Sequence, residues 1–335
     1  MLYIRTDMNE TVATGHMMRC LAIADAAREA GEDTLFIVAD EQAAGLLEEK
    51  GYSYCVLGTK WDDMESELPV LKKLIEERRI QRILIDSYQV TANYLKQLTA
   101  VTKTAYMDDL NAFFYPVDTL ICYENYWEQF NYPVRYPDTK LYLGPEYVPL
   151  RRGFSNCGRK NIRQKPGNLL LMSGGADQYG ILKRILEKLD RKAFQRIDVI
   201  CGRYNQFYDE LKIRYEPEPA VKIHTVVDNI ERYMQEADLA VSAGGVTVYE
   251  LCAVGTPAIS YTVADNQMGT AEKFSRDGII DYAGDIRSGD MIGRLLRLID
   301  AYCKDFALRR ERSGKMQEIV DGNGAARIAD ILKSI

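Results

Sequence analysis

The segment that restricts the fold of this chain most is its N-terminus, residues 2–31. A short apolar run, Leu2–Ile4, has the length of a buried strand, and a polar loop with small residues follows it. Residues 17–30 then have the composition of a helix, with apolar side chains over much of its surface. A strand, a glycine-containing loop and a helix in this order present free backbone N–H groups to an anion. Gly15 and His16 stand where the loop becomes the helix, so we expect both to face the ligand of that helix end.

Short apolar runs continue along the first half of the chain, and helical segments separate most of them. These runs lie at residues 34–39, 54–57, 82–86, 104–107 and 119–122. Strands that alternate with helices predict βαβ units and a mostly parallel sheet. Ligands of such open sheets bind beyond the carboxyl ends of the strands. The His16 loop, Asp86–Tyr88 and Asp108–Asp109 should therefore share one edge of the sheet.

A domain boundary is expected near the middle of the chain. Residues 123–150 lose the periodicity, and residues 151–167 are basic and loop-like, as in a solvated linker; a phosphate-facing role is the less favoured alternative. The length of 335 residues also exceeds the usual size of one hydrophobic core. We therefore expect an N-terminal domain over residues 1–150 and a C-terminal domain over residues 151–335, which includes the C-terminal helices.

The second half repeats the order of strand, glycine turn and helix. A strand at residues 168–172 precedes a turn that contains Gly174, and a strand at residues 239–242 precedes a turn that contains Gly244 and Gly245. The two halves show no repeat at the level of single residues. The expected fold class is therefore α/β, with two Rossmann-like domains that each contain a parallel sheet.

Composition excludes several classes of function. The net charge of −6 argues against nucleic acid as the main partner. No apolar run is long enough to span a membrane, and strand-like sequence at the N-terminus argues against a signal peptide. The seven cysteines form no CxxC pair and there are only two histidines, which argues against a disulfide framework and a metal site. We expect a cytoplasmic protein without membrane insertion.

The glycine turn in SAGGVTVYELCAVGTP, residues 242–257, is the strongest candidate binding motif. Gly244 and Gly245 lack a Cβ, so the backbone there can approach a phosphate closely. Thr247 opens the following helix, and Glu250, one turn further, could accept hydrogen bonds from ribose hydroxyls. A tight strand-to-helix turn with a solvated glutamate explains the spacing equally well.

Asp265, Asn266 and Gln267 follow the strand that ends at Tyr261. Consecutive polar side chains at the carboxyl end of a strand suit the hydroxyls and amides of a sugar. The alternative is an ordinary helix N-cap, in which Asp265 or Asn266 caps the helix toward Phe274.

His16 is the candidate catalytic group. A neutral imidazole can take a proton from water near pH 7, and a nearby diphosphate would favour its charged form. The alternative is a loop histidine with a structural hydrogen bond. Asp86 and Tyr88 share its expected edge of the sheet, although packing at a strand end is the commoner role of such residues.

Several motifs together resemble one family. IRTDMNETVATGHMMRCLAIADA, LIDSY, YVPLRRGF, MSGGADQ, SAGGVTVYELCAVGTPAI and ADNQ are similar, in the right order over roughly residues 2–290, to motifs of the PseG family and its spore-coat polysaccharide relatives. PseG proteins are UDP-2,4-diacetamido-2,4,6-trideoxy-β-L-altropyranose hydrolases. That family resembles MurG-type glycosyltransferases, which implies the GT-B fold, with two Rossmann-like domains and a nucleotide sugar in the cleft.

The resemblance also implies roles for individual residues. His16 would activate or position the attacking water, with Tyr88 close to the sugar as a second catalytic residue. The implied substrate-binding residues are Gly15, Asp86, Gly174, Val227, Gly244, Gly245, Thr247, Glu250, Asp265, Asn266 and Gln267. Among them, Val227 would contact uracil through backbone groups and the glycine turn would hold the diphosphate. Asn266 and Gln267 would contact the sugar.

The expected activity is inverting hydrolysis of a UDP-sugar at its anomeric C–O bond, with release of UDP, in nonulosonic acid or surface polysaccharide biosynthesis. Helix N-termini and glycine N–H groups can stabilise the leaving UDP, so the reaction needs no metal and no cofactor. One alternative is a MurG-like glycosyltransferase with the same UDP-sugar donor and a sugar or lipid acceptor. Another is a non-catalytic nucleotide-sugar-binding subunit of a larger synthase.

Overall fold

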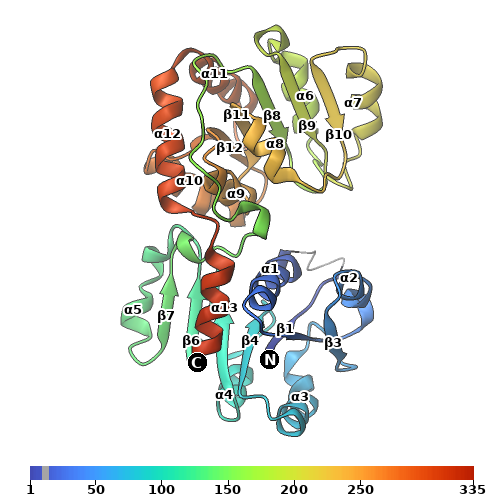
Figure 1. Ribbon diagram of the computed structural model, residues 1–335, viewed down its shortest axis with the longest axis vertical. Coiled ribbons are helices and arrows are strands. Elements are labelled where there is room, and N and C mark those ends of the chain that lie inside the picture. The colour runs from blue at the N-terminus through green and yellow to red at the C-terminus, as the bar shows by residue number, and fades with distance from the viewer. Residues whose placement is uncertain (10–14) are drawn as a thin grey trace. The chain divides into compact units, whose positions relative to one another are not determined.

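The computed structural model describes residues 1–9 and 15–335 and divides the chain into two compact units (Figure 1). Unit 1 comprises Met1–Arg152 and Gly322–Ile335, and unit 2 comprises Gly153–Asp321. The C-terminal helix α13 (Gly324–Ser334) thus belongs to unit 1, whereas we expected all C-terminal helices in the second domain. The physical reason is its apolar face, which is buried in unit 1, where α13 contacts α1 (Gly15–Glu29).

Unit 1 is built on a seven-stranded, entirely parallel sheet in the order β3-β2-β1-β4-β5-β6-β7. The strands are β1 (Leu2–Thr6), β2 (Thr34–Val38), β3 (Ser53–Val56), β4 (Arg82–Asp86), β5 (Lys103–Met107), β6 (Thr119–Cys122) and β7 (Lys140–Leu143). Besides α1 and α13, its helices are α2 (Ala44–Glu49), α3 (Met64–Arg78), α4 (Ala92–Thr99) and α5 (Tyr132–Arg135). The strand order reverses between β1 and β4, and such switch points open a ligand crevice at the carboxyl ends of the strands.

Unit 2 has a six-stranded parallel sheet in the order β10-β9-β8-β11-β12-β13. The strands are β8 (Asn168–Met172), β9 (Arg196–Ile200), β10 (Val221–His224), β11 (Leu239–Ala243), β12 (Ala258–Thr262) and β13 (Asp281–Asp285). The helices are α6 (Ile181–Lys188), α7 (Tyr208–Tyr215), α8 (Ile230–Glu236), α9 (Thr247–Val254), α10 (Met268–Arg276), α11 (Met291–Lys304) and α12 (Phe306–Ile319). Here the order reverses between β8 and β11. The predicted α/β class with two Rossmann-like units is confirmed.

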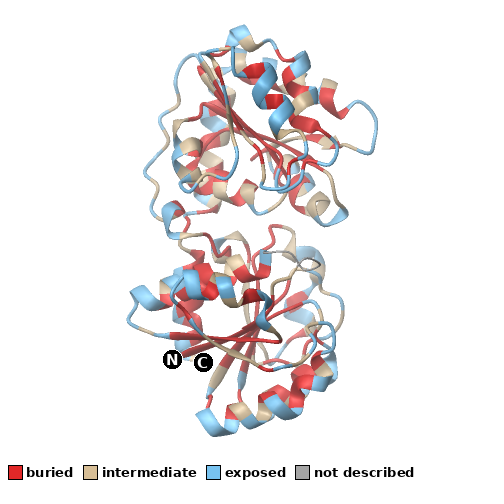
Figure 2. Cartoon of the chain, turned by 90° about the vertical axis from the view of Figure 1, so that its right-hand side faces the viewer, coloured by how far each residue is buried: buried red, intermediate tan, exposed pale blue. Residues whose placement is uncertain are grey.

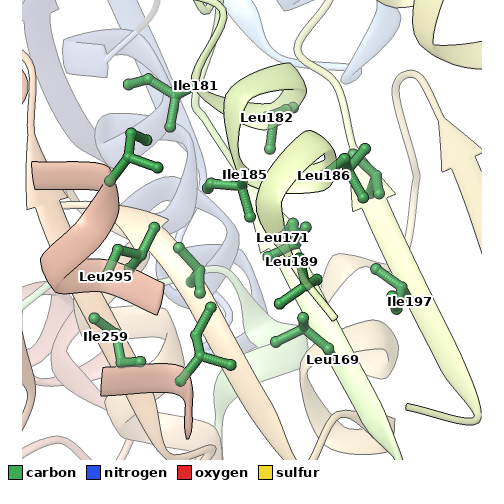
Figure 3. Packing of buried hydrophobic residues seen from close by; sticks show 14 of the residues in the cluster. Leu169, Leu171, Ile181, Leu182, Ile185, Leu186, Leu189, Ile197, Ile259 and Leu295 are labelled. Atoms are coloured by element: carbon green, nitrogen blue, oxygen red, sulfur yellow. The ribbon is translucent and has the colours of Figure 1, made fainter. Parts of the chain in front are cut away.

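Each sheet is buried beneath its helices, whose outer faces are exposed (Figure 2). In unit 2, Ile181 and Ile185 lie one turn apart on α6 and are fully buried against the strands, with Leu171 of β8 in the same cluster (Figure 3). Burying one such side chain contributes about 1.5–3 kcal/mol. The buried sheets form the cores of the two units, and the loops at the carboxyl ends of the strands project from them.

Two findings bear on membranes and metals. Within residues 1–9 and 15–335, no helix is long and apolar enough to cross a bilayer. Over the same residues, no three histidine, cysteine or acidic side chains are grouped as metal ligands.

Candidate active site

His16 lies in the first turn of α1, next to the carboxyl end of β4. Its Nδ1 atom is 2.6 Å from Oδ1 of Asp86, the last residue of β4, and both side chains are buried. A carboxylate can only accept, so in the neutral tautomer that carries its proton on Nδ1, Nδ1–H donates to Asp86 and the Nε2 atom keeps its lone pair. The pair therefore has the arrangement of a general base and the carboxylate that orients it. Residues 10–14, where the sequence predicts a loop, lie outside the described part of the chain.

Arg19 connects this pair to the neighbouring strands. It lies one turn after His16 on α1 and donates to Asp86 from Nε at 2.6 Å and from Nη2 at 2.5 Å. The same Nη2 atom is 2.9 Å from Nδ1 of His16. Its Nη1 atom donates to Asp109, after β5, at 3.0 Å and to the hydroxyl of Tyr123, after β6, at 2.8 Å. One guanidinium thus ties together the carboxyl ends of β4, β5 and β6.

Charge fixes the protonation of two groups in this network. Burial alone would raise the pKa of Asp86, but the positive charge of Arg19 and the contact with His16 hold this pKa well below its ordinary value. Partial burial and the nearby Asp109 carboxylate raise the pKa of Tyr88. At neutral pH Asp86 is therefore ionised. Tyr88 stays protonated and donates to Oδ2 of Asp109 at 2.7 Å.

A cavity of about 200 Å³ opens beside His16. Its lining consists of Asp7, His16, Trp61, Asp86, Ser87, Tyr88 and Gln89. The His16 and Tyr88 rings meet edge to face, with centroids 4.4 Å apart and an interplanar angle of 82°. The structure thus places His16, Asp86 and Tyr88 around one cavity. Gly15 starts α1, and a Cβ at this position would meet nothing within 4 Å.

The glycine turn of unit 2 lies between β11 and α9. A Cβ on Gly244 would lie 3.3 Å from Cβ of Ala271 and from Cγ2 of Thr262, so a larger side chain here would require these neighbours to shift. A Cβ on Gly245 would meet nothing within 4 Å. The N-cap residue of α9, Val246, is apolar and makes no capping hydrogen bond with its side chain. The start of this helix, with Thr247 and Glu250 half-buried in its first turn, is therefore suited to an anion.

Gly174 and Val227 follow other strands of the same sheet. Gly174 comes after β8 with a φ of 78°, which favours glycine. A Cβ on Gly202, after β9, would lie 2.2 Å from the carbonyl oxygens of Gly174 and Gly175, so the two turns pack backbone to backbone. Val227, after β10, helps to line a polar cavity of about 400 Å³ together with Arg196, Val226, Asp228, Asn229, Arg232, Tyr233 and Glu236. The expected contact between Val227 and the nucleobase stays a prediction.

Asp265, Asn266 and Gln267 form a single 3₁₀ turn, η6 (Asp265–Gln267), at the carboxyl end of β12. Neither this turn nor α10 is capped by a side chain of the described residues, so the N-cap alternative is not observed. Asp265 pairs with Arg287 at 2.6 Å, and Oε1 of Gln267 accepts from the Val263 amide at 3.0 Å. Asp265 and Asn266 are exposed, so both can reach a ligand.

Comparison with known proteins gives one family match and likeness in fold. Residues 169–279 match the glycosyltransferase family 28 C-terminal domain. Over its whole length the chain superposes on MurG of Acinetobacter baumannii with a TM-score of 0.72 and 14% identity, covering 100% of this chain and 99% of that one. The chain has the GT-B fold.

Two further proteins are similar to the chain. Spore coat polysaccharide biosynthesis protein SpsG of Bacillus subtilis (strain 168) is 21% identical, over 96% of this chain and 94% of the relative. The structure of Anabaena Alr3699/HepE in complex with UDP and glucose has a TM-score of 0.59 at 14% identity and covers 100% of both chains. The matched family domain includes β11, the glycine turn and α9.

Three site residues were not predicted from the sequence. Arg19 and Asp7 are single charged residues next to apolar segments. Arg19 bonds to Asp109 and Asp7 accepts from the Ala39 amide, and both of these partners are distant in sequence. Trp61 belongs to a turn before α3, and nothing in its neighbours indicates a cavity. One signal was available for Asp7, because it directly follows the first strand, at the edge where Asp86 was expected.

Proposed function

We propose that this protein is a nucleotide-sugar enzyme of the glycosyltransferase type, which takes a UDP-sugar donor and breaks the bond between its anomeric carbon and UDP. The observation that carries the proposal is the His16–Asp86 pair at a cavity of about 200 Å³, because it provides an oriented base. The family match of residues 169–279 and the relative with bound UDP and glucose support a nucleotide sugar as the ligand of unit 2. The polysaccharide role of the Bacillus relative supports a place in surface polysaccharide biosynthesis.

The proposed step transfers the sugar to an acceptor hydroxyl. Nε2 of His16 takes the hydroxyl proton while the acceptor oxygen forms a bond to the anomeric carbon. The C–O bond to the β-phosphate breaks, and its electron pair leaves with UDP. Attack from the side opposite to the leaving group inverts the anomeric configuration. Asp86 stabilises the imidazolium. Within unit 2, the start of α9 with Gly244 and Gly245 is the proposed binding site of the diphosphate.

Water is the second candidate acceptor, which would make the protein a hydrolase. The motif around His16 and the tyrosine after Asp86 favour it, because these segments resemble a hydrolase family. In this reading the same base activates a water molecule, and the donor is UDP-2,4-diacetamido-2,4,6-trideoxy-β-L-altropyranose or a close relative.

All seven cysteines are free thiols, which fits the expected cytoplasmic location.

The test is nucleotide release from a panel of UDP-, GDP- and CMP-sugars, followed by mass spectrometry with and without sugar and lipid-linked acceptors. A transferase releases UDP faster with an acceptor and forms a glycosylated product. A hydrolase releases UDP and free sugar at the same rate without one. Tight UDP binding without turnover under any condition would instead support the non-catalytic subunit. His16→Asn should abolish release, and an unchanged rate in this variant would exclude His16 as the base.

A further inference from the structure

A fully buried arginine in β1, an inner strand of unit 1, has no part in the proposed step. Arg5 lies in β1 and is 0% exposed. It donates to both carboxylate oxygens of Glu67 on α3, from Nε at 2.9 Å and from Nη2 at 2.6 Å, and its Nη1 atom donates to Asp7 at 2.6 Å. The hydroxyl of Tyr94 on α4 donates to Glu67 at 2.6 Å. Buried ion pairs of this kind add little net stability, so their role is better sought in positioning other groups.

The group that this network positions is the carboxylate of Asp7. Asp7 follows β1 directly, is 7% exposed, and lines the cavity beside His16. Its Oδ2 atom accepts from Arg5 at 2.6 Å and its Oδ1 atom accepts from the Ala39 amide at 2.8 Å. Burial alone would lower the pKa of Arg5, but Glu67 and Asp7 raise it well above its ordinary value, so the anchor keeps its charge. A carboxylate has about four acceptor positions, so one held this way can still accept from a ligand.

The charges around the cavity come in two similar sets. Arg5 is bonded to two carboxylates, Asp7 and Glu67. Arg19 is likewise bonded to two carboxylates, Asp86 and Asp109. Each set therefore carries one negative charge in excess. The described cavity lining contains no arginine or lysine. An anionic ligand in the cavity would therefore be repelled by the excess negative charge of the two sets, with no cation of the lining to offset it.

The remaining lining suits an uncharged ring with hydroxyls. Trp61 supplies an apolar surface, and Ser87, Tyr88 and Gln89 supply polar atoms at the rim. A few placed polar groups within a partly apolar wall are typical of small-molecule sites. Asp7 has acceptor positions left and can take hydrogen bonds only from donors, which means O–H or N–H groups of a ligand and not a carboxylate.

We propose that this cavity binds a neutral pyranose ring, that Asp7 accepts a hydrogen bond from one of its hydroxyl or amide groups, and that the site rejects acidic sugars such as uronates. The inference deepens the proposed function and rests on it, since it takes the ligand to be a sugar. Arg5 and Glu67 act through Asp7 and are positioning residues.

Trp61 allows a direct test, because the chain has only two tryptophans, Trp61 and Trp127. In a Trp127→Phe protein, tryptophan emission reports on the cavity alone. Free glucose or N-acetylglucosamine should change this emission saturably, and glucuronate should need at least about tenfold higher concentration. Among monodeoxy glucose analogues, the one that lacks the donor to Asp7 should bind about tenfold more weakly or worse. Adding Asp7→Asn should weaken the binding of neutral sugars. It should also remove the difference between glucose and glucuronate and the difference between glucose and that deoxy analogue.

The matched control is Asp40→Asn, which makes the same change after the neighbouring strand β2, outside the cavity lining. It should leave both differences intact. The proposal is overturned if no sugar changes the emission of Trp61, if glucuronate and glucose titrate alike, or if Asp7→Asn preserves the discrimination. The discrimination in the Trp127→Phe protein itself decides the question if the Asp7 variant does not fold. UDP release is measured separately, so a failure of the proposed enzyme activity is distinguishable from a failure of this inference.

Discussion

Replacing Asp86 by asparagine should both destabilise unit 1 and impair catalysis. The carboxylate accepts two hydrogen bonds from Arg19 and one from His16, all at 2.5–2.6 Å, and a weaker one from the Cys20 thiol at 3.3 Å. An amide has one acceptor oxygen, and its NH₂ group would face a donor. Removing one member of a buried ion pair costs about 3–5 kcal/mol, because the remaining charge stays buried without its partner.

This loss can be measured by thermal unfolding. For a domain of this size, 1 kcal/mol corresponds to about 2–4 °C, so the unfolding temperature of unit 1 should fall by on the order of 10 °C. UDP release, measured below that temperature, should fall about 100- to 10,000-fold, because His16 loses the group that sets its tautomer. The matched control is Asp63→Asn, at the N-cap of α3, where asparagine caps equally well. An Asp86→Asn protein with wild-type stability and turnover would refute the assigned role of this carboxylate.

Three further predictions follow from the same geometry. First, the stability that Asp86 contributes should be complete above about pH 4 and should fall as the solution becomes more acidic, since its pKa is lower in the folded than in the unfolded chain; acid titration of unfolding should show a shallower slope for Asp86→Asn, and an equal slope would contradict the shift. Second, Gly244→Ala should destabilise unit 2 by about 1–3 kcal/mol, because its Cβ would lie 3.3 Å from side chains of β12 and α10. Gly245→Ala should leave stability unchanged and weaken UDP binding in calorimetric titration, and unchanged binding would remove Gly245 from the phosphate site. Third, Tyr88→Phe should lose its hydrogen bond to Asp109 at a cost of about 1 kcal/mol and keep UDP release within about tenfold of the wild type; a complete loss of turnover would show that its hydroxyl takes part directly in the reaction.

Two strands that are hard to predict from the sequence, β7 and β13, lie at sheet edges. β7 belongs to the segment rich in tyrosine and proline, and β13 reads Asp-Tyr-Ala-Gly-Asp. Each pairs with one neighbour only, and each is largely half-exposed or exposed. An edge strand needs less apolar sequence than a central one, so its hydrophobic pattern is weak. The central strands were predictable because they are buried on both faces.

The candidate site shows a similar division. His16 and Asp86 were predictable from position, since one starts a helix and the other ends a strand. Arg19 and Asp7 were not, because their roles depend on partners such as Asp109, which is 90 positions from Arg19. The unit into which α13 packs was also not predictable from the sequence, because the pattern of an amphipathic helix shows which face is apolar but not which unit covers that face.

The return of α13 to unit 1 has a consequence for synthesis on the ribosome. Unit 2 is an insertion within unit 1, so all of its residues are made before Gly322. Unit 1 is therefore completed only after unit 2 has been made, and until α13 emerges, the apolar surface of α1 that it covers has no partner from this helix. Nascent chains of this protein should need protection at α1 for longer than at any strand of unit 2.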